Sequence, residues 1–396
     1  MSDYKYDVCI IGGLGHIGLP LGVVMASKGM TVCLYDINEE VAEVVRRGEM
    51  PFVEYGAVPL LKEALKQNQL DISLDVSCIA DAKYVVIAIG TPVDEYLNPQ
   101  TRKFLEFIKE IKPYLHTEQI IIVRSSVFPR TCEQILNELG SEETWHLTYC
   151  PERIVQGYMV EELEKLPQIV AGYTDHGIKE ASALFSQLTS TVIEASMNEA
   201  ELVKLFSNSW RYIQFAVANQ FYMICDDFDV DYDRVRSVMV EGYDRAKGLP
   251  SAGFAAGPCL LKDTMQLSAF YNNNFLFGHT AMMVNEGLPN YLVSKISQRH
   301  GLKEKKIGIL GMAFKADIDD IRDSLSYKLG KVLRFRGANV YYSDEFVKDP
   351  TFVSKEELLE QCDIVIVAVP HSNYKGLVCP KGVEVVDTWG LLDHSE

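Results

Sequence analysis

A glycine-rich turn near the N-terminus constrains the fold of this chain more than any other feature. The pattern G-x-G-x-x-G, formed by Gly13, Gly15 and Gly18, follows the apolar run Tyr6–Ile11 and opens an apolar helical stretch. We expect Gly13 to permit the tight turn, Gly15 to let backbone approach a pyrophosphate, and Gly18 to let the helix pack against the strand. Amide groups at the start of that helix could bind the anion. The alternative is a tight turn without a ligand.

An acidic residue stands at the end of the second apolar run. Asp36 directly follows Thr31–Tyr35, at the place where an acidic side chain binds the ribose hydroxyls of a dinucleotide. Because a carboxylate repels a 2′-phosphate, Asp36 favours NAD over NADP. His16 and Ile17 lie between the glycines and are predicted to contact the same cofactor. The turn and the acid together predict an NAD-binding domain.

Short β-branched runs alternate with helical periodicity through the first half of the chain, a pattern typical of a parallel sheet with crossover helices. The strands expected there are Tyr6–Ile11, Thr31–Tyr35, Tyr84–Ile89, Gln119–Val123, His146–Tyr149 and Thr191–Glu194. The helices expected include Ile17–Lys28, Glu39–Arg47, Arg102–Pro113 and His176–Gln187. This half is therefore predicted to be a doubly wound α/β domain.

The second half begins with a helical region and then returns to strands. No Pro or Gly occurs from Met197 until Gly242, which indicates one long helix or two in tandem up to about Arg245. Strands are expected again at Lys305–Leu310, Ala338–Tyr342, Asp363–Val369 and Val383–Val386. The predicted fold class is α/β, with two Rossmann-like doubly wound domains joined by a long central helix and a helical domain. The expected domain bounds are 1–196, 197–302 and 303–396.

The charge balance limits the classes of partner. Of 396 residues, 55 are Asp or Glu and 38 are Lys or Arg, which gives a formal net charge of −17. Nucleic-acid binding needs a basic surface that displaces phosphate counterions. DNA, RNA and anionic membranes are therefore not expected as partners, and an anionic small ligand would need a few locally placed cations.

Cysteine usage bears on the compartment. The nine cysteines include no C-x-x-C pair, which predicts reduced thiols rather than a disulfide framework or a metal site. The N-terminal apolar run Tyr6–Ile11 is too short for a signal peptide or a membrane span. We therefore expect a cytoplasmic protein without a bound metal.

Polar residues follow several predicted strands, at the edge where doubly wound sheets bind ligands. Thr91 and Pro92 come after one strand, Ser126 after the next, and Glu152 and Arg153 after a third. Glu152 at this edge would bring a carboxylate beside the nicotinamide. Each of these residues could instead be an ordinary turn, cap or surface position.

Three polar residues share a face of the predicted long helix. Glu201, Lys204 and Asn208 are spaced i, i+3 and i+7, which brings them to one side of the helix. Such a stripe is usually the solvated side of a helix, so the spacing alone assigns no function.

A cysteine lies in a loop of small residues. Cys259 follows the stretch that starts at Gly253 and precedes Lys262 and Asp263. A nearby cation lowers the pKa of a thiol and favours the nucleophilic thiolate. The alternative is a buried structural cysteine.

The motifs described above occur together and in this order along the chain. Because of them, the sequence resembles the UDP-glucose/GDP-mannose dehydrogenase superfamily, the nucleotide-sugar 6-dehydrogenases. The resemblance covers nearly the whole chain. The landmarks are Gly13–Pro20, Pro51–Gly56, Gly90–Pro92, Ser125–Thr131, Pro151–Glu152, Glu199–Asn208, Cys259–Asp263, Leu310–Lys315 and Asp320–Ser324. Pro151–Ile154, Gly157 with Glu162 and Leu163, and Asp387–Gly390 look most like the branch that oxidises UDP-N-acetylhexosamines.

The resemblance implies oxidation of the C6 alcohol of a nucleotide sugar to a carboxylate, with two NAD molecules used per turnover. Cys259 would hold the aldehyde as a thiohemiacetal and then as a thioester. Lys204 and Asn208 would stabilise the oxyanion at C6. Asp263 would order or deprotonate the water, and Glu152 would assist hydrolysis while positioning the sugar.

The resemblance also implies which residues bind the ligands. Thr91, Ser126, Lys262 and Arg322 are expected at the cofactor in addition to the glycine turn. The substrate residues implied are Glu152, Arg153, Lys204, Asn208, Arg245, Phe254, Gly257, Phe314 and Lys315. In the family the arginine corresponding to Arg245 comes from a partner subunit, which implies a homodimer through the central helix. The domains would bind NAD, form the dimer and bind the nucleotide sugar, in chain order.

Three departures from the family pattern bear on the substrate. Ala255 and Ala256 precede Cys259 where the family usually has glycine, Ser126 replaces Thr, and Arg130 stands where Gly is usual. The Lys262-Asp263 pair follows the glucose type, whereas Pro151–Ile154 follows the acetamido type. We favour a UDP-N-acetylhexosamine, with UDP-glucose or GDP-mannose as alternatives.

Two other classes remain open. A two-electron β-hydroxyacid-type dehydrogenase shares the dinucleotide domain and a Lys/Asn pair, but needs neither Cys259 nor a second α/β domain. An inactive NAD-binding protein is the third reading, because the loop before Cys259 departs from the family pattern.

Overall fold

The computed structural model describes residues 4–91, 93–94, 99–141 and 144–392. The chain divides into two compact units, Met1–Ser207 and Asn208–Glu396. Each unit carries its own sheet and its own hydrophobic cores.

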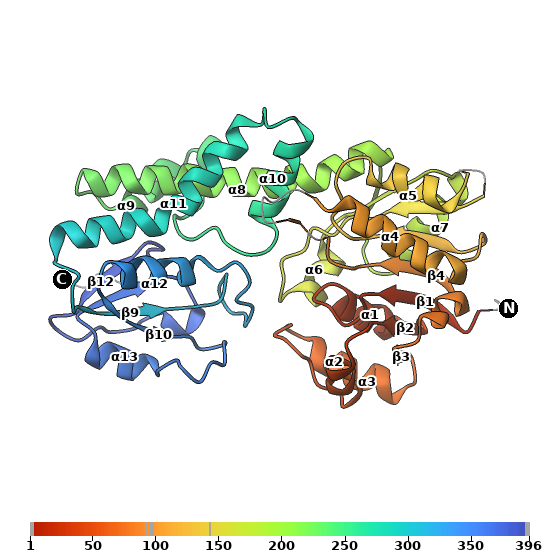
Figure 1. The fold of residues 1–396 in the computed structure, drawn as a ribbon, viewed down its shortest axis with the longest axis horizontal. Coiled ribbons are helices and arrows are strands. Elements are labelled where there is room, and N and C mark those ends of the chain that lie inside the picture. Colours follow the sequence, from red (N-terminus) through yellow and green to blue (C-terminus); the bar gives the residue numbers. More distant parts are fainter. Residues whose placement is uncertain (1–3, 92, 95–98, 142–143, 393–396) are drawn as a thin grey trace. The chain divides into compact units, whose positions relative to one another are not determined.

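The first unit is built on an eight-stranded sheet (Figure 1). In spatial order its strands are β3 (Leu70–Ser73), β2 (Val32–Tyr35), β1 (Tyr6–Ile11), β4 (Ala82–Ile87), β5 (Ile120–Val123), β6 (His146–Tyr149), β7 (Gln168–Gly172) and β8 (Val192–Glu194). The strand pairs are parallel except β6 with β7, which is antiparallel. Because the order reverses at β1 and β4, the switch point where such sheets bind ligands lies beside the first strand.

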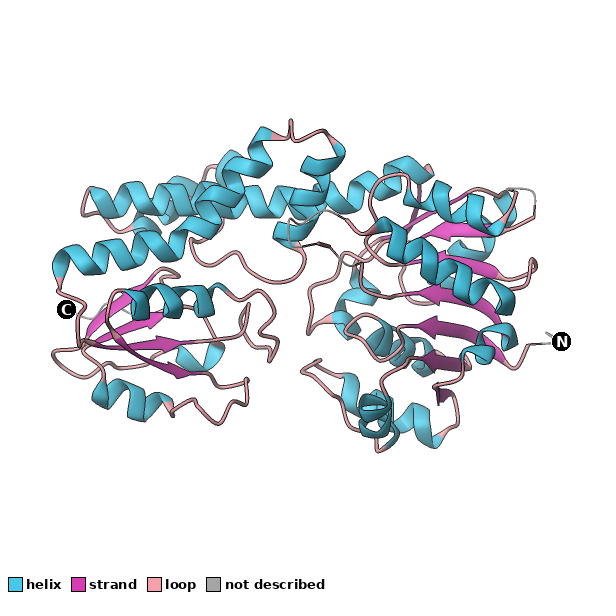
Figure 2. Ribbon diagram, in the orientation of Figure 1, coloured by secondary structure: helices cyan, strands magenta, loops and turns pink. Residues whose placement is uncertain are grey.

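Helices cover both faces of this sheet (Figure 2). They are α1 (Gly18–Ser27), α2 (Glu39–Arg46), α3 (Ala57–Lys66), α4 (Thr101–Ile111), α5 (Thr131–Leu139), α6 (Met159–Lys165) and α7 (Asp175–Phe185), with the short 3₁₀ turns η1 (Val76–Asp81) and η2 (Lys112–Tyr114). Alternate strand residues enter separate cores: Val8 and Ile10 pack in one, Cys9 and Ile11 in the other. Both faces of β1 are therefore buried, as expected for a parallel sheet.

The second unit combines helices with a four-stranded parallel sheet. Its helices are α9 (Tyr232–Val240), α10 (Leu260–Phe270), α11 (Leu276–Arg299), α12 (Leu325–Phe335) and α13 (Lys355–Gln361), with η3 (Asp244–Ala246) and η4 (Ser372–Tyr374). The sheet order is β10 (Asn339–Ser343), β9 (Lys306–Leu310), β11 (Ile364–Val367) and β12 (Glu384–Asp387). Helix α8 (Met197–Asp227) contains the boundary between the units.

The predicted fold class is confirmed, with differences at particular elements. The sequence left open whether the region after Met197 is one helix or two, and it is two, α8 and α9, separated near Asp229, whose φ is 57°. Strands β3 and β7 were not predicted. β3 is a short edge strand with exposed Asp71, so its apolar pattern is weak, and β7 pairs antiparallel with β6, outside the βαβ pattern used to locate the other strands.

Among the described residues, no helix combines the length and the apolar character that crossing a membrane requires.

Candidate active site

The glycine turn between β1 and α1 is fixed by backbone crowding. A Cβ on Gly18 would lie 2.2 Å from the Gly12 carbonyl oxygen, and one on Gly13 would lie 2.8 Å from the Ile10 carbonyl oxygen. Gly15 is exposed, and its nearest such contact is 3.5 Å. Gly18 thus has the predicted packing role, and Gly15 leaves open backbone for a phosphate. The positive φ, +77°, belongs to Gly12 rather than to Gly13, so the tight turn depends on the glycine before the motif.

Asp36 directly follows β2 and holds the glycine turn in place. One carboxylate oxygen accepts a hydrogen bond from the Leu14 amide at 3.1 Å, and the other accepts from the Ile37 and Asn38 amides at 2.8 and 3.2 Å. Helix α1 begins at Gly18 after Ile17, which makes no side-chain cap, so its first amides remain available to an anion. Half-buried Asp36 and the open turn fit a dinucleotide with a free ribose 2′-hydroxyl.

His16 lies beside the turn rather than in free solvent. Its ring centroid is 4.0 Å from that of Phe52, and its Nδ1 is 3.1 Å from the Gln156 side-chain nitrogen. These contacts give the ring a fixed position next to the exposed Gly15.

The predicted polar residues do follow β4 and β5. Thr91 and Ser126 are both partly buried, whereas Pro92 lies outside the described residues. The neighbouring Ser125 hydroxyl donates to the Ile89 carbonyl at 2.7 Å. Since Ser125 links the ends of β4 and β5, it is a structural residue of the strand edge that carries Ser126.

Glu152 forms a buried ion pair that sequence reasoning missed. The guanidinium of Arg124, with a side chain 1% exposed, contacts one Glu152 carboxylate oxygen. The other Glu152 oxygen accepts from the Arg153 and Ile154 amides, both at 2.7 Å. Arg124 also donates to Gln168 at 2.9 Å. One sequence signal could have indicated this ion pair: Arg124 is a charged residue directly after the apolar run Ile120–Val123.

The side chain of Arg153 binds backbone in its own unit. Its Nη2 donates to the Pro167 carbonyl at 2.6 Å, and the residue is partly buried. The guanidinium can still offer its other N–H groups to a ligand, because it carries several donors.

Glu201 on α8 caps helix α5. Its carboxylate accepts from the Arg130 amide at 2.6 Å and from the Cys132 amide at 3.0 Å. Arg130 has φ 67°, a left-handed conformation that favours glycine. Burial raises the pKa of Glu201, while these amide hydrogen bonds oppose the shift.

Lys204 and Asn208 lie one helical turn apart on α8. Lys204 is 8% exposed. Because burying a charge without an opposite charge is costly, a lysine in this position is suited to meeting an anionic group.

Cys259 lies at the start of α10, in the second unit. It is exposed, it occupies the N-cap position, and its carbonyl accepts the Asp263 amide at 2.8 Å. The positive end of a helix dipole stabilises a thiolate at this place. The alternative of a buried structural cysteine is wrong for Cys259.

Asp263 lies one turn further along α10 and is completely buried. One of its carboxylate oxygens accepts a hydrogen bond from the Asn208 amide group at 2.6 Å. The other has no hydrogen-bond partner among the described residues, and the Lys262 ammonium is 3.8 Å from it. A buried carboxylate oxygen with an unmet acceptor is a place for a water or a ligand hydroxyl.

The loop before Cys259 is pinned by a long-range amide network. Asn219 on α8 accepts from the Gly253 amide at 2.8 Å and donates to the Gly253 carbonyl at 3.0 Å. It also donates to Asn285 on α11 at 2.9 Å. All three residues are buried. Sequence reasoning missed Asn219 because its partners are far away along the chain.

The loop glycines pack against aromatic rings. Gly257 has φ +97°, and a Cβ there would lie 2.5 Å from the Phe314 ring. Ala255 and Ala256 are not among the described residues with positive φ, so alanine fits the loop backbone without strain. Phe254 is 5% exposed and belongs to the core beside the second sheet. Its side chain therefore serves packing in this unit.

Arg322 is held by a carboxylate close to Cys259. Its guanidinium nitrogens donate to both Asp320 oxygens at 2.6 to 3.0 Å. The Asp320 hydrogen bond raises the pKa of Arg322, and an electrostatic interaction with Cys259 adds to the effect. Lys315, which precedes this pair, is partly buried. The cations predicted for an anionic ligand therefore include one, Arg322, that is already oriented.

Arg245 lies in η3 and is exposed. Its guanidinium carbon is 6.0 Å from the centroid of the Tyr243 ring, which is 49% exposed. No described residue gives Arg245 an ion pair in this chain, so the side chain is available to a ligand or a second subunit.

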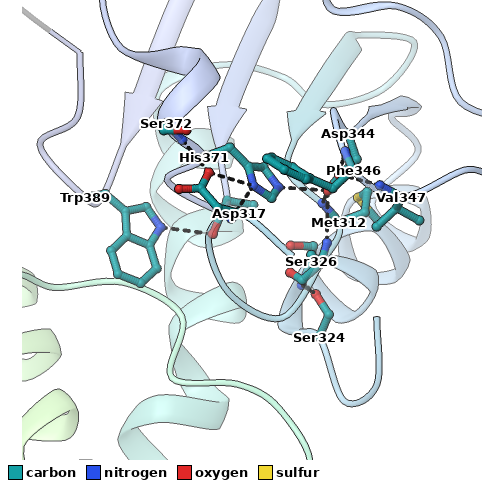
Figure 3. A network of polar contacts seen from close by, with 12 residues as sticks. Met312, Asp317, Ser324, Ser326, Asp344, Phe346, Val347, His371, Ser372 and Trp389 are labelled. Carbon is teal, nitrogen blue, oxygen red and sulfur yellow. Dashed lines mark hydrogen bonds and ion pairs between the residues drawn. The ribbon is translucent and has the colours of Figure 1, made fainter. Parts of the chain in front are cut away.

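A buried charge network organises the second sheet (Figure 3). The Asp344 carboxylate follows β10 and accepts from the Met312 and Ala313 amides at 2.6 and 3.0 Å, and from His371 Nε2 at 3.0 Å. His371 Nδ1 accepts from the Asp317 amide at 2.9 Å, which fixes its tautomer. Burial opposes ionisation of Asp344, but the His371 hydrogen bond and the amides lower its pKa to about 2.

The fold and these residues define an NAD-dependent dehydrogenase. Profiles of the UDP-glucose/GDP-mannose dehydrogenase family match the NAD binding domain at residues 6–189, the central domain at 198–286 and the UDP binding domain at 308–394. The chain belongs to this family and is a nucleotide-sugar dehydrogenase. The expected family, fold class and cofactor are confirmed.

Individual relatives span almost the full length. The UDP-N-acetyl-D-mannosamine dehydrogenase of Methanococcus maripaludis is 26% identical, over 100% of this chain and 95% of the relative. The structure of a UDP-glucose dehydrogenase from Pyrobaculum islandicum is 25% identical with a TM-score of 0.89, over 98% of this chain and 95% of that one. The UDP-D-ManNAc dehydrogenase structure from Pyrococcus horikoshii is 24% identical with a TM-score of 0.89, over 98% and 96%, and it supports the fold.

Proposed function

We propose that this enzyme oxidises the C6 alcohol of a UDP-N-acetylhexosamine to the uronic acid in two successive oxidations. The observation that carries the proposal is Cys259, an exposed thiol at the start of α10, with the buried Asp263 one turn behind it. A β-hydroxyacid-type dehydrogenase has no use for such a cysteine.

The residues that would hold NAD are those of the first-unit turn. Gly15 leaves open backbone for the pyrophosphate, Gly13 and Gly18 keep the turn and the helix close to the strand, and Asp36 would accept from ribose hydroxyls. His16, Ile17, Thr91, Ser126, Lys262 and Arg322 are the further residues that we assign to the cofactor. When bound, NAD supplies the hydride acceptor for both oxidations.

The covalent step belongs to Cys259. Its thiolate sulfur adds to the C6 aldehyde carbon, and the carbonyl oxygen takes up a proton from solvent to become the hydroxyl of a thiohemiacetal. Loss of a hydride and a proton from this adduct leaves a thioester. Water then attacks the thioester carbon, the carbon–sulfur bond breaks, and the thiolate returns as the carboxylate forms. Holding the aldehyde covalently prevents its escape between the two oxidations.

Asp263 and Asn208 are assigned to the hydrolysis. The Asp263 oxygen without a hydrogen-bond partner would accept a proton from the attacking water, because its other oxygen is held by Asn208. The Lys204 ammonium would stabilise negative charge at the C6 oxygen, together with the Asn208 amide. Glu152 is paired with Arg124, and this supports a positioning role at the sugar more than the direct transfer of a proton.

The substrate contacts follow the family pattern. Phe314 and Lys315 are assigned to the nucleotide and Arg245 to the diphosphate, while Arg153 and Gly257 are assigned to the sugar side. Phe254 is assigned to the same side through the loop that it anchors, because its side chain packs in the core. The mannosamine relative supports an N-acetylhexosamine, and the UDP-glucose dehydrogenase structure keeps UDP-glucose as the second candidate. Ala255 and Ala256 introduce methyl groups beside this loop.

We also propose that the enzyme is a cytoplasmic homodimer. Its three domains would be 1–196, 197–302 and 303–396, and the central helical domain would form the dimer. One face of α8 supports it, because Trp210, Val217 and Phe221 are 61%, 40% and 39% exposed, and large exposed apolar patches mark interfaces. Trp210→Glu is expected to give monomers by sedimentation velocity, whereas Phe335→Glu, at an even more exposed aromatic residue of α12, leaves the dimer intact. A Trp210→Glu protein that sediments as the unchanged species would contradict this interface.

The stoichiometry of NADH tests the function. Each UDP-N-acetylhexosamine is expected to yield two NADH, and Cys259→Ser to abolish acid formation while NAD affinity, measured by calorimetry, stays near wild type. Cys379→Ser, a partly buried thiol of the same unit, is the matched control. One NADH per sugar would instead indicate a two-electron enzyme. None across UDP-N-acetylhexosamines, UDP-glucose and GDP-mannose would show that the protein is an inactive NAD binder.

A further inference from the structure

Three cysteines of the first unit meet in its hydrophobic core. Cys9 lies on β1, Cys33 on β2 and Cys78 in η1, and their three sulfur atoms are all within 4.8 Å of one another. We propose that these thiols form a three-coordinate site for one soft, thiophilic metal ion of the Cu(I) type. Neither the dehydrogenase chemistry nor the NAD site uses them.

The sheet register brings the thiols together. Cys9 and Cys33 are directly paired across the parallel strands β1 and β2, so their side chains leave the same face of the sheet. The 3₁₀ turn η1 packs on that face and contributes Cys78 to the same hydrophobic core. Two ligands on rigid strands and a third on a packed turn make a preorganised set.

The distances suit one metal ion among three sulfurs. Metal–sulfur bonds of about 2.3 Å in a trigonal arrangement separate the sulfurs by about 4 Å. The sulfur atoms, which lie within 4.8 Å of one another, therefore need only a small inward movement of side chains.

The donor set selects the kind of ion. No histidine or carboxylate among the described residues completes the group as a fourth ligand, whereas structural zinc is almost always four-coordinate. Thiolate ligands favour Cu(I) among the physiological metals. Cys9 and Cys33 are 0% exposed and Cys78 is 8% exposed. Water that could act as a fourth zinc ligand is therefore largely excluded, and a metal ion would enter on the side of Cys78.

The thiols already interact with one another. Cys78 forms sulfur hydrogen bonds with both Cys33 and Cys9. The ion would replace thiol protons, which leave to solvent, and no electron is transferred. This step needs the metal ion alone.

The test is a competition titration on the reduced full-length protein under anaerobic conditions. Cu(I) is delivered as its complex with a chromophoric chelator, and the protein is expected to withdraw one tightly held equivalent. Cys78→Ser should weaken retention by more than the roughly 100-fold that loss of an outer-shell partner costs. Cys150→Ser, another buried thiol of the same unit, is the matched control and should retain the ion, as should Cys259→Ser, which removes the exposed thiol.

X-ray absorption on the loaded protein is expected to give three sulfur neighbours at about 2.3 Å. Circular dichroism of metal-free Cys78→Ser checks folding, and Cys33→Ala serves as the second variant if that protein is unfolded. The proposal is overturned if no equivalent is withdrawn from the chelator, if Cys78→Ser and Cys33→Ala both retain it as tightly as wild type, or if oxygen neighbours replace sulfur.

Discussion

Two buried carboxylates, Glu152 in the first unit and Asp263 in the second, were both expected to act in hydrolysis, yet their surroundings differ. Glu152 contacts the Arg124 guanidinium and accepts two amide hydrogen bonds. Asp263 is held through one oxygen by Asn208, and its other oxygen has no hydrogen-bond partner among the described residues. A carboxylate with all its acceptors satisfied orders the protein around it. A carboxylate with an oxygen that accepts no hydrogen bond can take a proton from a bound water.

The largest effect is expected at Asp263. Asp263→Asn keeps the shape and the contact with Asn208 but removes the basic oxygen, so kcat should fall by about 10²- to 10⁴-fold. Rapid-quench detection of the thioester on Cys259 measures where the reaction stops, and the thioester should accumulate. Glu152→Gln is the matched substitution and should lower kcat less. Equal losses of kcat in the two variants would contradict the distinction between the carboxylates.

The next effect concerns the stability of the Glu152 pair. Arg124→Met leaves the Glu152 charge buried without its partner, so the free energy of unfolding should fall by about 3–5 kcal/mol. Urea denaturation measures it. The double variant Arg124→Met with Glu152→Leu should regain much of that loss, since replacing both members of a buried pair is often neutral. A single variant as stable as wild type would show that the pair contributes nothing.

Asp344 extends the comparison to a third carboxylate, one whose two oxygens both accept hydrogen bonds. Its folded pKa of about 2 is below the ordinary value of 3.8, so its ionised form stabilises the fold above the unfolded pKa. That contribution, about 2 kcal/mol, should be lost as pH falls from about 4 through about 2. Urea denaturation at several pH values, with Asp344→Asn as the reference, isolates it. If wild type and the variant changed in parallel over that range, the carboxylate would not be the cause.

The sequence predicted best where neighbouring residues decide the structure. The strand before Gly13, the helix that begins at Gly18 and the acid Asp36 were found because their spacing is local. Strand β3 was missed because it is short and half exposed, and β7 because it runs antiparallel to β6. The sequence could not show which of the nine cysteines is exposed. The exposure of Cys259 depends on the loop before it, which is held by a hydrogen bond between the distant Asn219 and Gly253.

By itself, the sequence determined the α/β class, the NAD-binding turn and the residues that resemble a nucleotide-sugar dehydrogenase, because periodicity and motif spacing act over short stretches of chain. Only the tertiary structure decided which polar groups are satisfied. Three features depend on contacts between residues distant in the chain: the Arg124 partner of Glu152, the Asn208 hydrogen bond that holds one oxygen of Asp263, and the meeting of Cys9, Cys33 and Cys78. Such contacts form only when strands pair and helices pack.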